Sequence, residues 1–303
     1  MAKKSKKTKP NPSKKTKSSK NNNSICAIGG QAVIEGVMMK NKNKVAVAIR
    51  KPNKKIKVKK IPYKNPLNKS KIFKLPVLRG IVTLVDTLVL GMKTLNYSAS
   101  ESLDEDQQIS KREMIITTII AIAFAIGIFV IAPLYITKTI VDKGFLFNLI
   151  DGIMRLVLFI AYILVISLMS DIRRVFQYHG AEHKTIACYE AKKPLTIKNV
   201  KKFPTVHRRC GTTFILIVLV VATLVFSLII WEGMLIRIAS RIILIPFIAG
   251  ISYELLKLGA KYPKNILLNI LIIPGLWIQK LTTREPDNKQ IEVAIESVKA
   301  VLK

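Results

Sequence analysis

The sequence predicts an α-helical polytopic membrane protein. We expect about four transmembrane helices, interfacial helices and a small cytoplasmic part that contains a β-hairpin. Half of the 303 residues are hydrophobic although the formal net charge is +32, a combination typical of a basic membrane protein. The apolar residues also form long runs. The run at 114–137 has 24 uncharged residues, enough to cross a hydrocarbon core of about 30 Å.

The chain begins with a lysine-rich tail. Residues 1–24 contain nine lysines and no acidic residue. So few apolar side chains cannot bury enough surface to fold, and we expect this tail to be disordered. Two interpretations of the tail stay open. It binds anionic lipid or RNA, or it only keeps the chain soluble and sets its topology.

The next segment, 25–75, is expected to be a small cytoplasmic part with β structure. β-Branched and alternating stretches at 45–50 and 56–61 flank Pro52-Asn53, which predicts a hairpin. Glu35 is an isolated acid in a strongly basic neighbourhood, so it is either a metal ligand or an ion-pair partner. No Lys-Ser/Thr pair follows Gly29-Gly30 at the required spacing, which excludes a phosphate-binding loop of the nucleotide-binding type.

A first helix is predicted at 76–99. Its charged residues Arg79, Asp86 and Lys93 recur every seven positions on an otherwise apolar helix. This stripe predicts a helix that lies at the membrane interface or packs its polar side against the soluble part. The acidic cluster at 100–113 is expected to be a loop.

Four apolar runs are predicted to span the membrane, at 114–137, 149–170, 212–231 and 235–256. Asp151 and Arg155 lie four residues apart and are expected to pair. Arg237 and Arg241 near the start of the fourth run either extend toward the interface or mark a polar interior face.

The C-terminal part has weaker membrane signals. The apolar stretch 265–279 is short and contains Pro274-Gly275, which predicts a re-entrant or interfacial helix, with a fifth span as the alternative. Residues 286–303 alternate apolar and charged positions at helical spacing and predict a soluble amphipathic helix. Trp231 and Trp277 lie at span ends and are expected to be interface anchors.

Charge distribution orients the chain. The lysine tail and the basic segment 171–211 belong in the cytoplasm by the positive-inside rule, so both termini are expected on the cytoplasmic side of the plasma membrane. The expected segments are a disordered tail at 1–24, a β-containing part at 25–75, an interfacial helix and acidic loop at 76–113, two spans at 114–170, a cytoplasmic histidine-rich basic loop at 171–211, two spans at 212–257, and a re-entrant or interfacial helix with a C-terminal helix at 258–303.

All three histidines lie in that basic segment. His179 and His183 are four residues apart with Glu182 between them, so on a helix the two imidazoles share a face about one turn apart. This H-x-x-E-H string is the inverted zincin pattern, in which two histidines bind zinc and the glutamate is the general base. His207 and Cys210 follow in the same segment.

A catalytic metal site needs about three protein ligands and one open position. The candidates for the third ligand are His207, Cys210, Glu35 and Glu190. Glu182 would act on a water molecule whose pKa a divalent metal, zinc above all, lowers to about 7. The expected reaction is metal-assisted hydrolysis of an amide, ester or phosphate at the cytoplasmic membrane surface. Candidates for stabilising an oxyanion are Lys184, Arg208 and Arg209.

Two other interpretations of the histidine segment stay open. The histidines bind no metal and instead bind phosphate or lipid headgroups, or hydrogen-bond the loop into shape. Alternatively, a closed structural zinc site forms from His179, His183, His207 and Cys210. The remaining cysteines, Cys26 and Cys188, are expected to be ordinary small apolar residues.

Four strings carry a resemblance to a known family: 29–39 (GGQAVIEGVMM), 178–184 (YHGAEHK), 207–212 (HRRCGT) and 285–287 (EPD). They resemble the YqhQ-like family of bacterial membrane proteins, a domain-of-unknown-function family. The resemblance covers about residues 25–303. It implies a metal-dependent enzyme in which the 29–39 stretch and the histidine segment belong to one functional unit.

Three classes of function compete on the sequence. The first is an integral membrane enzyme, a metal-dependent hydrolase with a cytoplasmic site. The second is a non-enzymatic scaffold whose basic surface binds a partner complex, RNA or anionic lipid. A transporter is the weakest, because the spans contain few polar residues beyond Asp151, Arg155, Arg237 and Arg241.

Overall fold

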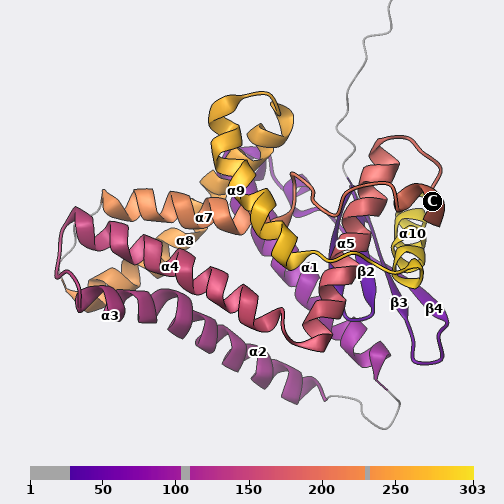
Figure 1. Cartoon of the computed structure of the whole chain (residues 1–303), viewed down its shortest axis with the longest axis horizontal. Helices are drawn as coiled ribbons and strands as arrows, with labels where there is room; N and C mark the ends of the chain where they lie inside the picture. The colour runs from indigo at the N-terminus through magenta and orange to yellow at the C-terminus, as the bar shows by residue number, and fades with distance from the viewer. Residues whose placement is uncertain (1–27, 104–109, 229–232) are drawn as a thin grey trace, which may run out of the picture.

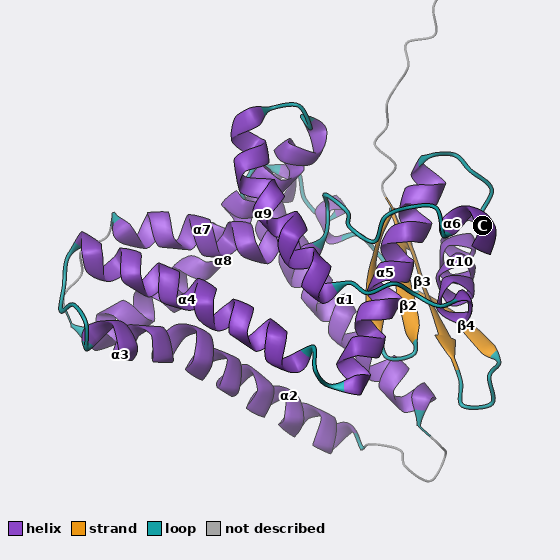
Figure 2. Cartoon of the chain, viewed as in Figure 1, coloured by secondary structure: helices purple, strands orange, loops and turns teal. Residues whose placement is uncertain are grey.

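A computed structural model describes residues 28–103, 110–228 and 233–303. An elongated bundle of apolar helices forms one end of the molecule, and a sheet covered by helices forms the other (Figure 1). The described strands all lie at that second end (Figure 2). The expected helical membrane fold with a small β-containing part is confirmed. The lysine tail, Cys26 and Trp231 lie outside the described residues.

The sheet has four antiparallel strands in chain order, so each strand pairs with its neighbour in sequence. The predicted hairpin at 45–61 is confirmed as the pair β3–β4. The glycine-rich stretch before it forms a second hairpin, whose turn holds Glu35 at φ 53°. The strands are β1 (Ile28–Val33), β2 (Gly36–Asn41), β3 (Lys44–Arg50) and β4 (Ile56–Ile61).

Helices cover both faces of this sheet. One face packs Ala46 and Ala48 of β3 against two helices, α5 (Ser170–Glu190) and α10 (Asn288–Leu302). The opposite face packs Val45, Val47 and Ile49 of β3 against α1 (Leu78–Ser102). Because successive side chains of a strand point to opposite faces, a strand buried on both sides is apolar at almost every position, as β3 is.

Helix α1 joins the sheet to the bundle of apolar helices. Two residues of its charged stripe make the two connections. Arg79 forms an ion pair with Glu254 of α8 in the bundle. Asp86 accepts hydrogen bonds from Lys40 of β2 at 2.5 Å and from Tyr63 at 2.6 Å. Two of the three predicted stripe residues therefore pair with the rest of the protein, while Lys93 is exposed. Of the predicted stripe, Asp86 packs against the sheet part as expected, whereas Arg79 packs against the apolar helix α8.

Within the described part of the chain, three helices are long and apolar enough to cross a membrane. They make the chain a multi-pass membrane protein. The first, Arg112–Lys138, runs through α2 (Lys111–Ile126), the π-helical turn η4 (Gly127–Ile131) and α3 (Ala132–Lys138). The π-helical turn lies just before Pro133, which has no N–H to donate to the hydrogen bonds of a regular α-helix. The others are α4 (Phe145–Ile166) and α8 (Met234–Lys261).

The predicted third span forms a shorter helix. α7 (Gly211–Ser227) has 17 residues and packs against α4, α8 and α9. The stretch predicted to be re-entrant or interfacial is the similarly short α9 (Ile266–Thr282).

The predicted basic loop at 171–211 is helical over its first half, because α5 buries an apolar stripe against the sheet. The remaining short elements are η1 (Pro66–Asn68), η2 (Ile72–Lys74) and α6 (Ile197–Val200).

A buried charge cluster links α4 to α8. The predicted Asp151–Arg155 pair is confirmed at 3.1 Å, and Arg241 of α8 reaches the same carboxylate at 3.0 Å. Arg241 also donates to Asn148 Oδ1 at 3.0 Å. The arginines of α8 therefore form a polar interior face, and Arg241 is only 3% exposed. Charged groups in apolar surroundings need partners, and here α4 and α8 supply them to each other.

Asp151→Ala tests this cluster. The change leaves the guanidinium groups of Arg155 and Arg241 buried without their shared carboxylate, which costs about 3–5 kcal/mol. The melting temperature of detergent-purified protein should fall by on the order of 10 °C. Asp142→Ala, at an exposed loop position, is the control and should leave it unchanged. Equal melting temperatures for the two variants would show that the cluster does not stabilise the bundle.

Candidate metal centre

Two histidines and a cysteine meet where α5 approaches the start of α7. His179 and His183 lie on one face of α5, with ring centroids 4.4 Å apart. Cys210 is the N-cap of α7, and its Sγ lies 3.3 Å from His179 Nε2. One ligand atom from each of the three residues lies within 4.8 Å of the other two. The structure thus brings together three of the residues that the sequence singled out.

Backbone carbonyls hold both imidazoles in the orientation that metal ligation requires. His179 Nδ1 lies 2.9 Å from the carbonyl oxygen of Thr282, and His183 Nδ1 lies 2.5 Å from that of Thr205. A carbonyl can only accept, so each Nδ1 donates its proton and each Nε2 is left as an acceptor, which at His179 lies 3.3 Å from the Cys210 thiol. Metal-binding histidines are commonly fixed in this way.

The spacing between Cys210 and His179 fits a tetrahedral ion. Zinc bonds of about 2.0–2.1 Å to nitrogen and about 2.3 Å to sulfur place neighbouring ligand atoms roughly 3.3–3.8 Å apart. The 3.3 Å between Cys210 Sγ and His179 Nε2 meets this requirement. Burial lowers the pKa of His183, which favours the neutral imidazole that binds metals, although Cys210 and the Thr205 carbonyl oppose the shift. The donor set suits zinc or another borderline transition metal.

His207 lies beside this group with both ring nitrogens engaged. Its ring centroid is 5.7 Å from that of His183. Its Nδ1 accepts the N–H of Arg209 at 3.4 Å, so Nε2 carries the proton and donates to Glu190 at 3.4 Å. Burial of Glu190 opposes ionisation, but the bond from His207 and the charge of Arg209 lower its pKa. His207 and Glu190 therefore satisfy each other.

Glu35 is placed elsewhere. It sits in the β1–β2 turn, where Arg174 donates to both of its carboxylate oxygens and the Tyr178 hydroxyl donates at 3.2 Å. This is the ion-pair role that the sequence left open for it. Burial raises the pKa of Tyr178, so its hydroxyl remains a donor to Glu35.

Glu182 is buried at the edge of the sheet. It is 5% exposed, and the N–H of Gly30 in β1 bonds its carboxylate. Burial raises the pKa of Glu182, against the opposing influence of His179, His207 and this bond. A Cβ on Gly30 would lie 2.9 Å from the Glu182 oxygen. The glycine lets the backbone approach the carboxylate, and this is the link between the 29–39 stretch and the histidines.

Gly180 has a similar role on the other side of α5. A Cβ there would lie 2.1 Å from the carbonyl oxygen of Arg284. The N–H of Arg284 also donates to the carbonyl oxygen of Phe176 in α5, at 2.9 Å. The segment after α9 can therefore cross α5 closely and bring the Thr282 carbonyl to His179. The carbonyls of Thr282 and Thr205 were missed from the sequence, because backbone groups leave no side-chain signal. The feature of the sequence that could have indicated this close crossing is Gly180, a glycine inside a helix.

The candidate oxyanion donors point to other partners. Lys184 is buried, and its Nζ lies 2.6 Å from Glu285 and 3.1 Å from the Lys201 carbonyl. Arg208 donates to Asn269 and Arg209 to Glu190. Outside this group, Cys188 is buried as expected, and Trp277 is 64% exposed on α9.

The loop that carries His207 is fixed by one amide side chain. Gln279 of α9 is fully buried, accepts the N–H of His207 at 2.8 Å and donates to the His207 carbonyl at 2.8 Å. It also donates to Thr213 Oγ1 at 2.6 Å. Gln279 thus ties the loop before Cys210 to α7 and α9.

Comparison with known proteins gives a family and one relative. The family model described as "Protein of unknown function (DUF1385)" matches residues 75–303. A protein of Bacillus subtilis (strain 168), described as "Uncharacterized protein YqhQ", is 36% identical over 294 residues, which cover 91% of this chain and 92% of that protein. No solved structure matches the chain.

Gly180→Ala tests the close crossing at α5. The added methyl group collides with the backbone at Arg284, and such overpacking typically costs about 1–3 kcal/mol. We expect a lower melting temperature than in Gly211→Ala, where a Cβ would meet nothing within 4 Å. A Gly180→Ala protein as stable as the Gly211→Ala control would refute this role for the glycine.

Proposed function

The chain belongs to the DUF1385 family of proteins of unknown function, and from its own residues we propose that it is a metal-dependent hydrolase at the cytoplasmic surface of the membrane. His179, His183 and Cys210 would hold one divalent ion, with zinc as the first candidate. The family description contains no activity, so the proposal stands on the geometry of the site.

The observation that carries it is the paired orientation of the two imidazoles. Both Nδ1 atoms bond backbone carbonyls, which leaves both Nε2 atoms unprotonated, and the Nε2 of His179 lies 3.3 Å from the buried Cys210 thiol. Three protein ligands with an open position are typical of catalytic sites, whereas closed structural sites have four. The engagement of both His207 nitrogens favours the three-ligand arrangement.

Each part of the site then has a task. A divalent ion there would supply Lewis acidity toward a water molecule or a substrate oxygen. Glu182 would accept the proton of the attacking water as general base. Its burial supports this role, because a carboxylate with a raised pKa holds a proton better near neutral pH. The bond from Gly30 would keep the carboxylate in place.

The site is assigned to the cytoplasm on charge and packing. The basic segment around the histidines follows the positive-inside rule. Helix α10 near the C-terminus packs on β2 and β3 near the N-terminus, so both parts lie on one side of the membrane. We place both termini in the cytoplasm of a bacterial cell, with α7 completing an even number of crossings.

The scaffold hypothesis is the second candidate. The exposed edge strand β4 presents Lys57, Lys59 and Lys60, which supports binding of an acidic partner, RNA or anionic lipid. The lysine-rich tail would add to this surface.

Metal content is the first test of the hydrolase. Elemental analysis of detergent-purified protein, prepared without chelator, should find about one zinc, iron or manganese ion per chain. His179→Ala/His183→Ala should lose it, because two of three ligands are removed. His207→Gln is the matched control and should retain it.

Two results would count against this site. Absence of metal from the wild type, even after reloading, would overturn the metal centre and favour the scaffold. Loss of metal in His207→Gln, with an unchanged melting temperature, would instead indicate a closed four-ligand structural site.

Glu182→Gln separates catalysis from metal binding. The amide keeps the shape of the carboxylate and cannot accept a proton, so we expect a normal metal content and at least a 100-fold loss of rate. The rate would be measured on chromogenic esters, amides and phosphates with metal-loaded protein. A Glu182→Gln protein as active as the wild type would remove the glutamate from the mechanism.

A further inference from the structure

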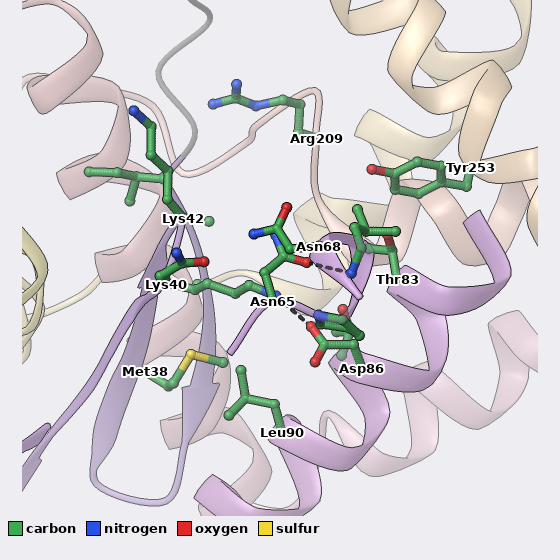
Figure 3. Close-up of a pocket in the computed structure, with 17 residues that line it drawn as sticks. Met38, Lys40, Lys42, Asn65, Asn68, Thr83, Asp86, Leu90, Arg209 and Tyr253 are labelled. Carbon is green, nitrogen blue, oxygen red and sulfur yellow. Dashed lines mark hydrogen bonds and ion pairs between the residues drawn. The ribbon is translucent and has the colours of Figure 1, made fainter. Parts of the chain in front are cut away.

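A cavity of about 700 Å³ lies between the sheet and α1, next to the metal centre. Strands β1 and β2 form one wall, η1 and α1 form another, and Arg209 and Tyr253 line it from the bundle side (Figure 3). Its volume is in the range of small-molecule sites, about 300–1,000 Å³. No step of the proposed hydrolysis uses it.

The lining carries an excess of positive charge. Lys40, Lys42 and Arg209 contribute cations, and Asp86 is the one acid among the described lining residues, while Arg209 also pairs with Glu190 outside the lining. Lys40 and the Tyr63 hydroxyl already bind Asp86, at 2.5 and 2.6 Å. In Figure 3, Lys42 and Arg209 lie at one end of the cavity, and the apolar side chains of Met38 and Leu90 lie at the other. The cavity is therefore cationic at one end and apolar at the other.

Neutral hydrogen-bonding groups complete the polar part. The side chains of Asn43, Asn65 and Asn68 line the cavity, as does Thr83. The Thr83 hydroxyl is buried without a protein partner among the described residues. Amide and ammonium donors around a cationic centre suit a phosphate group, which accepts several bonds at once.

The cavity lies beside the apolar helix α8. Tyr253 belongs to the membrane-crossing helix α8, and Gly80 of α1 packs directly on Gly250 of the same helix. Facing outward on α1, Leu88 and Val89 are 58% and 65% exposed. Just before α1, Ile72 and Leu75 are 60% and 52% exposed and alternate with lysines. Apolar side chains interleaved with lysines suit the headgroup layer of an anionic membrane.

We propose that this cavity binds the phosphate-bearing headgroup of an anionic membrane lipid. The phosphate lies against Lys42 and Arg209, and the lipid tails leave along α1 into the bilayer. The site lies beside the metal centre, because Gly30 and Arg209 line the cavity while Gly30 also contacts Glu182. The proposal stands on the cavity alone and holds whether or not a metal is bound.

Calorimetric titration of the full chain in a non-ionic detergent tests it. The probes are dihexanoyl phosphatidylglycerol, zwitterionic dihexanoyl phosphatidylcholine and inorganic phosphate. We expect saturable binding of the anionic lipid at one site per chain. Binding should be weaker by at least fivefold for the zwitterionic lipid and for free phosphate. Free phosphate that binds as tightly as the anionic lipid would overturn the lipid assignment.

Lysine substitutions locate the binding. Lys42→Asn removes one cation from the cavity at a turn position with φ 52°, which asparagine tolerates. It should weaken lipid binding about fivefold, which corresponds to the binding free energy of about 1 kcal/mol that each lysine contributes near anionic lipid. Lys54→Asn is the matched control, an exposed turn lysine of the same sheet at φ 65° that lies outside the cavity. Both variants keep the N-terminal tail, so equal affinities would assign binding to general charge and overturn the cavity.

A steric variant gives an independent readout. Thr87→Trp fills the cavity from an exposed position of α1 and changes no charge. We expect loss of lipid binding with unchanged gel-filtration and circular dichroism profiles. Unchanged lipid affinity in this folded variant would contradict binding in the cavity.

Discussion

The close packing of α5 on both of its sides is the constraint on which the rest of the sheet-containing part depends. Gly30 brings the sheet edge against Glu182 on one side, and Gly180 brings the segment after α9 across the helix on the other. Neither approach leaves room for a Cβ. These two contacts place a strand from the start of the chain and a carbonyl from near its end around a single turn of helix.

From this arrangement the ligand geometry follows. The carbonyl of Thr205 comes from the loop before α7 and that of Thr282 from the last residue of α9, yet both bond Nδ1 atoms of α5. Gln279 and the N-cap position of Cys210 hold the third donor against the same turn. Three separate parts of the chain must be in place before the site exists, so the candidate metal site depends on the complete tertiary fold.

Helix α1 connects this site to the membrane. Its Arg79–Glu254 pair and its Gly80–Gly250 contact attach it to α8, while Asp86 attaches it to β2. The cavity opens along this helix, between a basic soluble layer and an apolar bundle. An amphiphile meets both kinds of surface there, which is the physical reason for assigning the cavity to a lipid. Within the bundle, shared charges join α4 to α8.

The sequence by itself determined the membrane class, the β3–β4 hairpin and the pairing of His179 with His183. Each of these depends on local periodicity: apolar run length, alternation of two, and helical spacing of four. Only the tertiary structure decided that Cys210 meets His179 across 31 positions and Thr282 across 103, that Glu35 pairs with Arg174 outside the group, and that the glycine-rich stretch is a hairpin supporting Glu182. Those outcomes depend on which surfaces pack together over long chain separations, and local spacing does not encode that choice.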